Sequence, residues 1–172
     1  MDQPIPSGWI SQAEFSDAVK ALPLVSIDLV VVNSSCEMLL GRRVNRPAQG
    51  CWFTPGCRVR KNETLECVLQ RVWQEELGQT STLNAPLLLG AWEHIYPDSA
   101  FDERISTHYV NLPHLVLLSN QTAWDWQLVP SDQHDQWRWM ALSQVTNNAS
   151  VHAYVRPYAL EASRHLEKSF NI

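Results

Sequence analysis

The chain alternates between apolar runs and short polar breaks, which predicts a mixture of strands and helices. Residues 24–32 are almost all apolar and rich in β-branched side chains, as is typical of a buried strand. Turn-forming residues at 33–35 separate this run from a second apolar run at 37–40. Further strands are expected at residues 51–54, 87–96, 107–118 and 137–142.

Two helices are predicted near the ends of the chain. Residues 11–22 begin with Ser11 as a helix N-cap and carry Glu14 at the capping-box position, and Pro23 ends the helix. Residues 154–168 have the spacing of a closing helix. The first 23 residues are therefore expected to form a helical arm.

The clearest helical pattern covers residues 64–77, where apolar side chains recur at helical spacing. Gly78 follows at the position where a glycine commonly ends a helix. The alternation of strands and helices, with no long linker or repeat, predicts an α/β fold in the form of a mixed α/β sandwich. The length of 172 residues suits one domain, residues 1–172.

Composition excludes several classes of protein. The formal net charge of −5 argues against a general nucleic-acid binder, and no apolar run approaches the roughly 20 residues of a membrane span. No secretory signal pattern opens the chain. The four cysteines show neither a C-x-x-C pair nor a spaced Cys/His quartet, which argues against zinc. We therefore expect a cytoplasmic protein with reduced thiols and with no membrane or nucleic-acid partner.

Charge is unevenly distributed along the chain. Between residues 42 and 61 there are six basic residues and no acidic one: Arg42, Arg43, Arg46, Arg58, Arg60 and Lys61. Carboxylates then follow within the predicted helix. A cationic segment followed by a carboxylate-bearing helix suits a phosphate chain bridged to a divalent metal ion, although charge alone fits a solvated basic face equally well.

Residues 56–79 resemble the Nudix box, G-x5-E-x7-R-E-U-x-E-E-x-G-U, in which U is a bulky aliphatic residue. The x7 spacing separates Glu63 from Arg71, and the R-x3-E-E-x-G pattern ends on Glu75, Glu76 and Gly78. There are two departures from the box. Val72 replaces the usual glutamate, and six residues rather than five separate Gly56 from Glu63.

The box chemistry is that of a hard metal ion. Mg²⁺ prefers oxygen ligands and is often held by one or two carboxylates together with substrate phosphate. Helix positions 72, 75 and 76 share one face, because residues three or four apart are neighbours, and Arg71 can pair with Glu75. Each glutamate taken alone fits a solvated helix face as well as a metal site.

A closer resemblance is to the GDP-mannose mannosyl hydrolase branch of the Nudix superfamily. Residues 45–53 are similar to that branch's N-R-P-A-Q-G-x-W-F element, and residues 55–59 are similar to its P-G-G-R-V element, with Cys57 in place of the second glycine. The resemblance extends from about residue 24 to residue 152. Further matches lie at residues 24–28, 92–94, 107–110 and 130–135.

This resemblance implies Mg²⁺-dependent hydrolysis of GDP-mannose, with GDP-glucose as the alternative substrate, by inverting attack of water at the anomeric carbon. The implied ligands of one Mg²⁺, for which Mn²⁺ can substitute, are the Gly56 carbonyl, Glu76 and Gln133, with Glu75 left open as an additional ligand. His134 would be the base. The remaining implied residues are Arg43, Arg58 and Tyr109 at the diphosphate, Asp28 and His94 at the sugar, and Trp9, Ile10 and Phe15 at the nucleotide. The resemblance also implies a homodimer and a Nudix-type fold, which is an α/β/α sandwich with a mixed central sheet.

Two other functions remain open at this stage. One is a Nudix diphosphatase that attacks phosphorus, which the Glu75–Glu76 pair fits. The other is a non-catalytic sensor of nucleotide sugars, which the altered box fits. The individual residues also have structural readings: His134 as a surface histidine, Asp28 as a solvent-facing strand residue, and His94 and Tyr109 as core or dimer contacts.

Overall fold

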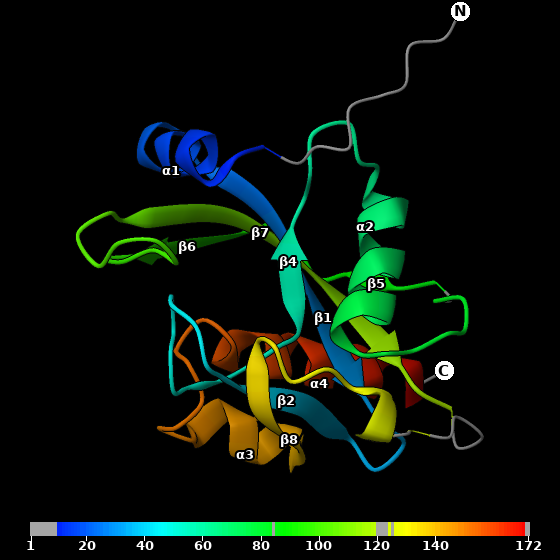
Figure 1. Cartoon of the computed structure of the whole chain (residues 1–172). Helices are drawn as coiled ribbons and strands as arrows, with labels where there is room; N and C mark the ends of the chain where they lie inside the picture. The colour runs from blue at the N-terminus through cyan, green and yellow to red at the C-terminus, as the bar shows by residue number, and fades with distance from the viewer. Residues whose placement is uncertain (1–9, 84, 120–123, 125, 171–172) are drawn as a thin grey trace, which may run out of the picture.

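A mixed sheet runs through the molecule with helices on both of its faces (Figure 1). The computed structural model describes residues 10–83, 85–119, 124 and 126–170. Its eight strands in these residues are β1 (Leu24–Val32), β2 (Glu37–Arg43), β3 (Trp52–Phe53), β4 (Gly56–Arg58), β5 (Leu87–Leu88), β6 (Trp92–Tyr96), β7 (Thr107–Leu117) and β8 (His134–Ala141). The α-helices are α1 (Gln12–Ala21), α2 (Leu65–Arg71), α3 (Leu142–Asn147) and α4 (Arg156–Phe170).

The sheet brings distant parts of the sequence together around β1. β1 and β7 run parallel over their length, and β4 pairs antiparallel with β1, placing Gly56 opposite Asp28. On the other side of β7, β6 pairs antiparallel and places His94 opposite Tyr109. β2 connects this part of the sheet to β3 and β8. Four neighbouring strands, β1, β4, β6 and β7, thus carry four residues singled out in the sequence: Asp28, Gly56, His94 and Tyr109.

The side chains of β1 alternate between two hydrophobic cores. Ile27, Leu29 and Val31 pack in a core with residues of α2, while Val30 and Val32 pack in a core with residues of α3 and α4. All five side chains are essentially inaccessible to solvent. Because each face of the sheet is covered by helices, the predicted α/β/α sandwich is confirmed.

The N-terminal helix has the predicted capping box. Glu14 accepts a hydrogen bond from the Ser11 backbone, and Ser11 Oγ accepts one from the Glu14 backbone. α1 lies beside β6 and β7 at one end of the molecule (Figure 1). Its Phe15 packs edge-to-face against Phe101, with ring centroids 5.1 Å apart. Phe101 belongs to the polar loop between β6 and β7. The contact between Phe15 and Phe101 therefore packs α1 against this loop at the rim of the cavity described below.

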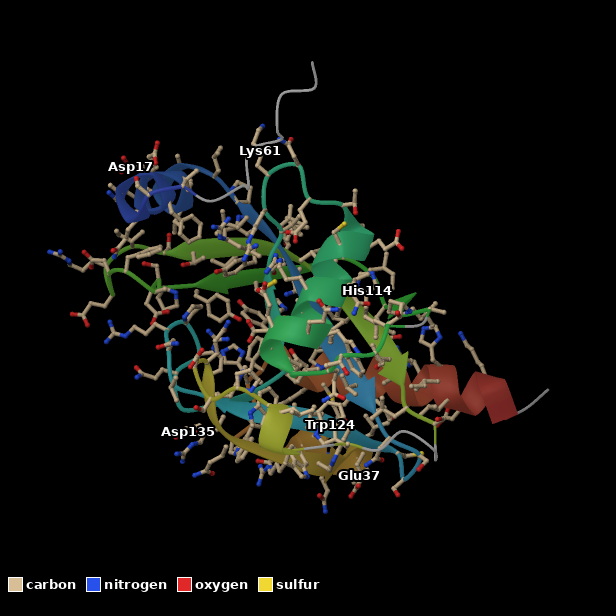
Figure 2. The ribbon with its side chains drawn as sticks, turned by 45° about the vertical axis from the view of Figure 1, so that its right-hand side comes forward. Asp17, Glu37, Lys61, His114, Trp124 and Asp135 are labelled. Carbon is tan, nitrogen blue, oxygen red and sulfur yellow. The ribbon has the colours of Figure 1, made fainter. Side chains whose placement is uncertain are left out.

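The helix predicted for residues 64–77 changes its winding halfway along. α2 begins after Thr64, whose side chain accepts a hydrogen bond from Cys67, and is α-helical only to Arg71. Val72–Glu76 form a π-helical turn (η1). Val72 and Trp73 are buried in the core, and π-helical turns of this kind occur frequently at functional sites. Trp73 also meets Trp124, below the end of this helix in Figure 2.

Other boundaries differ from the sequence prediction. The strand predicted at 87–96 is interrupted after β5, where Gly90 adopts a φ of 138°. Residues 56–58, for which no strand was predicted, form β4, because their backbone pairs with the central strand. Helix α3 was not predicted. No helix in the described part of the chain combines the length and apolar character needed to cross a bilayer. All four cysteines are free.

Gly78 provides a test of how the end of this helix is constrained. Its φ is +65°, and a Cβ atom there would overlap the backbone carbonyl of Leu128. We expect Gly78→Ala to lower the free energy of unfolding by more than about 2 kcal/mol, since backbone strain and overlap add. Gly50→Ala is the matched control, because φ there is +80° with no atom within 4 Å of the added Cβ. Urea unfolding that gives equal losses for both variants would contradict the overlap.

Candidate active site

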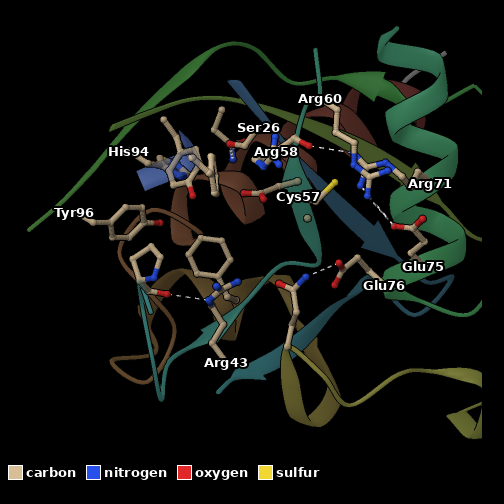
Figure 3. Close-up of a pocket in the computed structure, with 18 residues that line it drawn as sticks. Ser26, Arg43, Cys57, Arg58, Arg60, Arg71, Glu75, Glu76, His94 and Tyr96 are labelled. Atoms are coloured by element: carbon tan, nitrogen blue, oxygen red, sulfur yellow. Dashed lines mark hydrogen bonds and ion pairs between the residues drawn. The ribbon is translucent and has the colours of Figure 1, made fainter. Parts of the chain in front are cut away.

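A cavity of about 370 Å³ opens where β1, β4, β6 and β7 meet the end of α2 (Figure 3). His94 and Tyr96 lie at one end of it, and Glu75, Glu76 and Arg71 lie at the other, with Arg58 and Cys57 between them. Ten of the residues singled out in the sequence line this cavity: Phe15, Asp28, Arg43, Gly56, Arg58, Glu75, Glu76, His94, Tyr109 and Gln133. The fold therefore gathers these side chains into one place, while their individual roles stay predictions.

Three predicted residues are not among those that line it. Ile10 is 44% exposed, and Trp9 lies outside the described residues. His134 is buried, with its ring against Trp137 at 4.6 Å between centroids. A Cβ on Gly41 would lie 2.6 Å from the His134 ring, so the absence of a side chain at Gly41 makes room for this position.

The position of His134 limits what it can do in this conformation. Neither ring nitrogen has a hydrogen-bond partner among the described residues, and burial lowers the pKa of His134 to about 3. The imidazole is therefore neutral, as a base requires. However, it does not line the cavity, so a role as base needs a movement of the chain around residue 134.

Two of the three metal ligands implied by the resemblance contact one another at one end of the cavity, and the third lines the same cavity. Gln133 Nε2 donates a 2.5 Å hydrogen bond to Glu76 Oε1, and Gly56 lines the same cavity. Burial raises the pKa of Glu76 to about 7. A nearby cation stabilises the charged form of a carboxylate that is held away from water. Carboxylate, amide and carbonyl oxygens are also the ligands that Mg²⁺ prefers. The residues present therefore fit a divalent metal ion, with the Gln133 amide turned to present its oxygen.

Glu75 has different surroundings from Glu76. Its side chain is 56% exposed, and its Oε2 lies 3.6 Å from Arg71 and 3.7 Å from Arg60. The predicted ion pair between Arg71 and Glu75 is thus present. In this arrangement two guanidinium groups already neutralise Glu75, which makes it less available than Glu76 as a metal ligand.

Arg71 and Glu63 fix the segment between β4 and α2. Arg71 donates to both carboxylate oxygens of Glu63, at 2.7 and 2.8 Å, and also to the backbone carbonyl of Arg58 at 3.1 Å. Glu63 in turn accepts from the Arg60 backbone at 2.8 Å. The Arg71 guanidinium lowers the pKa of Glu63, so both partners stay charged. The x7 spacing of the box therefore places an ion pair beneath the cavity wall.

Two arginines are oriented by neighbouring aromatic and backbone groups. Arg43 donates to the Pro47 carbonyl at 2.9 Å, and its guanidinium lies 5.7 Å from the Phe53 ring centroid. The Arg58 guanidinium lies 4.2 Å from the ring centroid of Phe15. Guanidinium groups held in this way are well suited to bind phosphate oxygens.

Cys57 occupies the middle of the cavity wall. It pairs with Ile27 in the register of β4 and β1. Burial raises the pKa of the Cys57 thiol to about 11, so the thiol is protonated near neutral pH. A side chain here, in place of the second glycine of the resembling branch, adds bulk between the two ends of the cavity without adding charge.

Three lining residues were missed in the sequence. Ser26, Tyr96 and Asn111 also line the cavity. Each is two positions along its strand from a predicted site residue, namely Asp28, His94 or Tyr109. Side chains two apart on a strand share a face, so the period of two residues would have identified all three.

A second cavity of about 490 Å³ continues from the first. The two share Arg43, Pro47, Tyr109 and Gln133. Arg46 crosses beside it to the loop between β6 and β7, with ion-pair distances of 3.8 Å to Asp98 and 3.1 Å to Glu103. A ligand larger than the first cavity thus has room to extend, and Ala100 of this loop lines the second cavity.

Asp28 allows a pH-dependent test of the site. Burial raises its pKa from 3.8 to about 6, so between these values the folded protein holds a proton that the unfolded chain has lost. The contribution of Asp28 to stability therefore falls as pH rises through this window. The Asp28→Asn variant has no carboxyl group at this position, so it does not lose stability in this way as pH rises. We expect the stability of the variant relative to the wild type to increase by about 1 kcal/mol between pH 5 and pH 8 in urea unfolding. A constant difference would contradict the buried ionisation.

Comparisons with known proteins identify the family of this chain. A family model described as the NUDIX domain matches residues 22–159. The low-salt glycan biosynthesis protein Agl8 of Haloferax volcanii is 44% identical over 105 residues, which make up 61% of this chain and 65% of that protein. This chain therefore spans slightly less than two thirds of that relative.

Solved structures share the fold. The MutT NUDIX hydrolase from Burkholderia pseudomallei superposes with a TM-score of 0.63 at 26% identity, covering 81% of this chain and 97% of its own. A bifunctional NMN adenylyltransferase/ADP ribose pyrophosphatase from Francisella tularensis, complexed with AMP and a manganese ion, gives a TM-score of 0.62 at 18% identity over 91% of this chain and 45% of its own. With the family match covering most of its length and four box residues lining one cavity, the chain belongs to the NUDIX family, whose hydrolases generally use divalent metal ions such as Mg²⁺ or Mn²⁺.

Proposed function

We propose that this protein hydrolyses a GDP-hexose, GDP-mannose or alternatively GDP-glucose, to GDP and free sugar with the help of Mg²⁺. One observation carries the proposal: a single cavity joins the buried hydrogen-bonding residues Asp28 and His94 to the Glu76–Gln133 pair, with Arg58 between them. Such a cavity can hold a sugar at one end and a diphosphate near the other. The glycan-biosynthesis name of the Haloferax relative supports a sugar-containing substrate.

The arginines provide what the departing diphosphate needs. Displacement at an anomeric carbon passes through an oxocarbenium-like state, and glycosidases protonate the leaving oxygen with an acid. GDP leaves as a stable anion, so positive charge can replace that acid. Arg43 and Arg58 would bind the diphosphate, and Tyr109 would donate a hydrogen bond close by. A divalent ion held by Gly56, Glu76 and Gln133 would supply further charge stabilisation.

The attacking water needs a base on the face opposite the leaving group, since inversion requires it. The resemblance assigns this role to His134, next to the proposed ligand Gln133. Because the His134 ring lies outside the cavity, we propose that it turns inward when substrate and metal ion bind. The binding free energy of the substrate would drive that movement.

A second candidate is hydrolysis at phosphorus, and two observations favour it. Glu75 lies beside Glu76 on the cavity wall, and His134 does not line the cavity. A Nudix diphosphatase would use the same cavity and metal ion but would release a sugar phosphate and a nucleoside monophosphate.

The site of bond cleavage separates the two functions. We expect GDP-mannose hydrolysed in ¹⁸O-labelled water to release free mannose that carries the label, because water attacks carbon. Mass spectrometry of the products measures this directly. Label in mannose 1-phosphate or GMP would establish the second candidate and exclude the first. Binding of GDP-mannose without any product in the presence of Mg²⁺ would indicate a sensor.

The two adjacent glutamates give a matched pair of variants. We expect Glu76→Gln to lower turnover at limiting Mg²⁺ by at least about tenfold, through weaker metal binding. Glu75→Gln is the control and should have a smaller effect, since Arg60 and Arg71 already neutralise Glu75. Titration of Mn²⁺ by calorimetry measures metal binding independently of turnover. Equal losses of affinity in both variants would make Glu75 a ligand as well.

A further inference from the structure

One hydroxyl group connects the polar side chains at the sugar end of the cavity. Tyr158 lies on α4, behind the cavity wall, and is fully buried. Its Oη lies 2.8 Å from His94 Nε2, 3.3 Å from Asp28 Oδ2 and 3.3 Å from Asn111 Oδ1. These three partners come from three different strands, β6, β1 and β7. A residue outside the Nudix box thus joins every strand that supplies a buried polar side chain to this end.

The number of protons determines how this network is arranged. Burial and the nearby Asp28 charge raise the pKa of Tyr158, so its hydroxyl keeps its single proton. The Asp28 carboxylate can only accept. Asn111 donates its amide to Ser26 Oγ at 2.9 Å, so its Oδ1 faces Tyr158 and also accepts. The Asp28 and Asn111 oxygens already compete for the one proton of the Tyr158 hydroxyl. If His94 Nε2 were a third acceptor, one more lone pair would be left without a hydrogen-bond donor.

The network is satisfied best when His94 donates from Nε2 to the Tyr158 oxygen. Tyr158 then donates its own proton toward Asp28 or Asn111. Burial lowers the pKa of His94 to about 4, so the ring is neutral and carries one proton, which this arrangement places on Nε2. Its Nδ1 is left as an acceptor.

We propose that Tyr158 is a positioning residue that holds His94 as the Nε2–H tautomer and orients Asp28, so that both offer hydrogen-bond acceptors to the hydroxyl groups of a hexose. This inference rests on the proposed function and identifies the source of its selectivity for a sugar. Hydroxyl groups donate, phosphate oxygens at neutral pH chiefly accept, and this end of the cavity is thus complementary to a polyol.

The surrounding aromatic rings keep the hydroxyl and the imidazole in place. The Tyr158 ring meets Trp92 edge-to-face with centroids 5.6 Å apart. The His94 ring stacks on Tyr154 at 4.3 Å and an interplanar angle of 7°. Tyr154 is in turn fixed by its own hydroxyl, which accepts from the Ile95 backbone N–H and donates to the Ile95 carbonyl. Packing therefore restricts rotation of His94, and the Tyr158 hydroxyl determines where its proton lies.

The matched variants are Tyr158→Phe and Tyr154→Phe. Each removes one hydroxyl and keeps the ring, but only the Tyr158 hydroxyl contacts Asp28, His94 and Asn111. Proton–nitrogen NMR correlations of the imidazole rings, assigned by a His94→Gln spectrum, report the tautomer without any need for activity. We expect the wild type and Tyr154→Phe to show His94 protonated at Nε2, and Tyr158→Phe to lose that single state. A wild-type ring protonated at Nδ1 would overturn the proposal even if Tyr158→Phe does not fold.

Kinetics and binding provide the functional readout. We expect Tyr158→Phe to raise KM for the GDP-hexose by about tenfold, the loss expected when one hydrogen-bonded group is no longer oriented. Its affinity for GDP, which lacks the sugar, should stay within about twofold of the wild type. Equal weakening of GDP and GDP-hexose, or no change in either, would overturn the proposal. Failure of the wild type to release free sugar would instead refute the proposed function. The NMR measurement of the His94 tautomer does not depend on that activity and would still test the role of Tyr158.

Discussion

The close pairing of β4 with β1 is the constraint on which the site depends. A Cβ atom on Gly56 would overlap Asp28 and the Ile27 carbonyl, so only glycine lets the two strands approach here. This pairing sets a candidate carbonyl ligand beside a carboxylate from the core strand. It also carries Arg58 into the cavity, where Arg71 holds its backbone carbonyl and bonds Glu63. The ion pair and the strand pairing support one another.

Much of this arrangement could be predicted from the sequence because it follows local rules. Residues 24–32 form a strand with the predicted bounds, and the Ser11–Glu14 capping box starts the first helix as predicted. Gly78 ends the long helix in the left-handed conformation. The fixed spacing of the box located Gly56, Glu75 and Glu76, and the resemblance to the hydrolase branch implied the other seven of the ten lining residues. The strand, helix and box signals are short-range or periodic, so they can be recognised in a single sequence.

What could not be predicted depends on packing between distant segments. The π-helical turn arises where Val72 and Trp73 enter the core, and no local pattern marks it. His134 follows Gln133 directly, yet its side chain leaves the cavity because Gly41 on the neighbouring strand makes room for it. Tyr158 reaches Asp28 across 130 positions of the sequence. Such contacts require the register of the whole sheet and the placement of the last helix.

The surroundings of Val72, Glu75 and Glu76 in the fold explain how the altered Nudix box can still bind a metal ion. Val72 stands where the box has a glutamate, and it is fully buried among Val68, Leu69 and Trp73, where a charge would be costly. Glu75 forms ion pairs with Arg60 and Arg71. Of the box carboxylates at this end of the cavity, Glu76 therefore combines burial with a raised pKa and an amide partner. A site reduced in this way suits a single metal ion, and under the proposed function the arginines would supply the remaining charge stabilisation for the diphosphate leaving group.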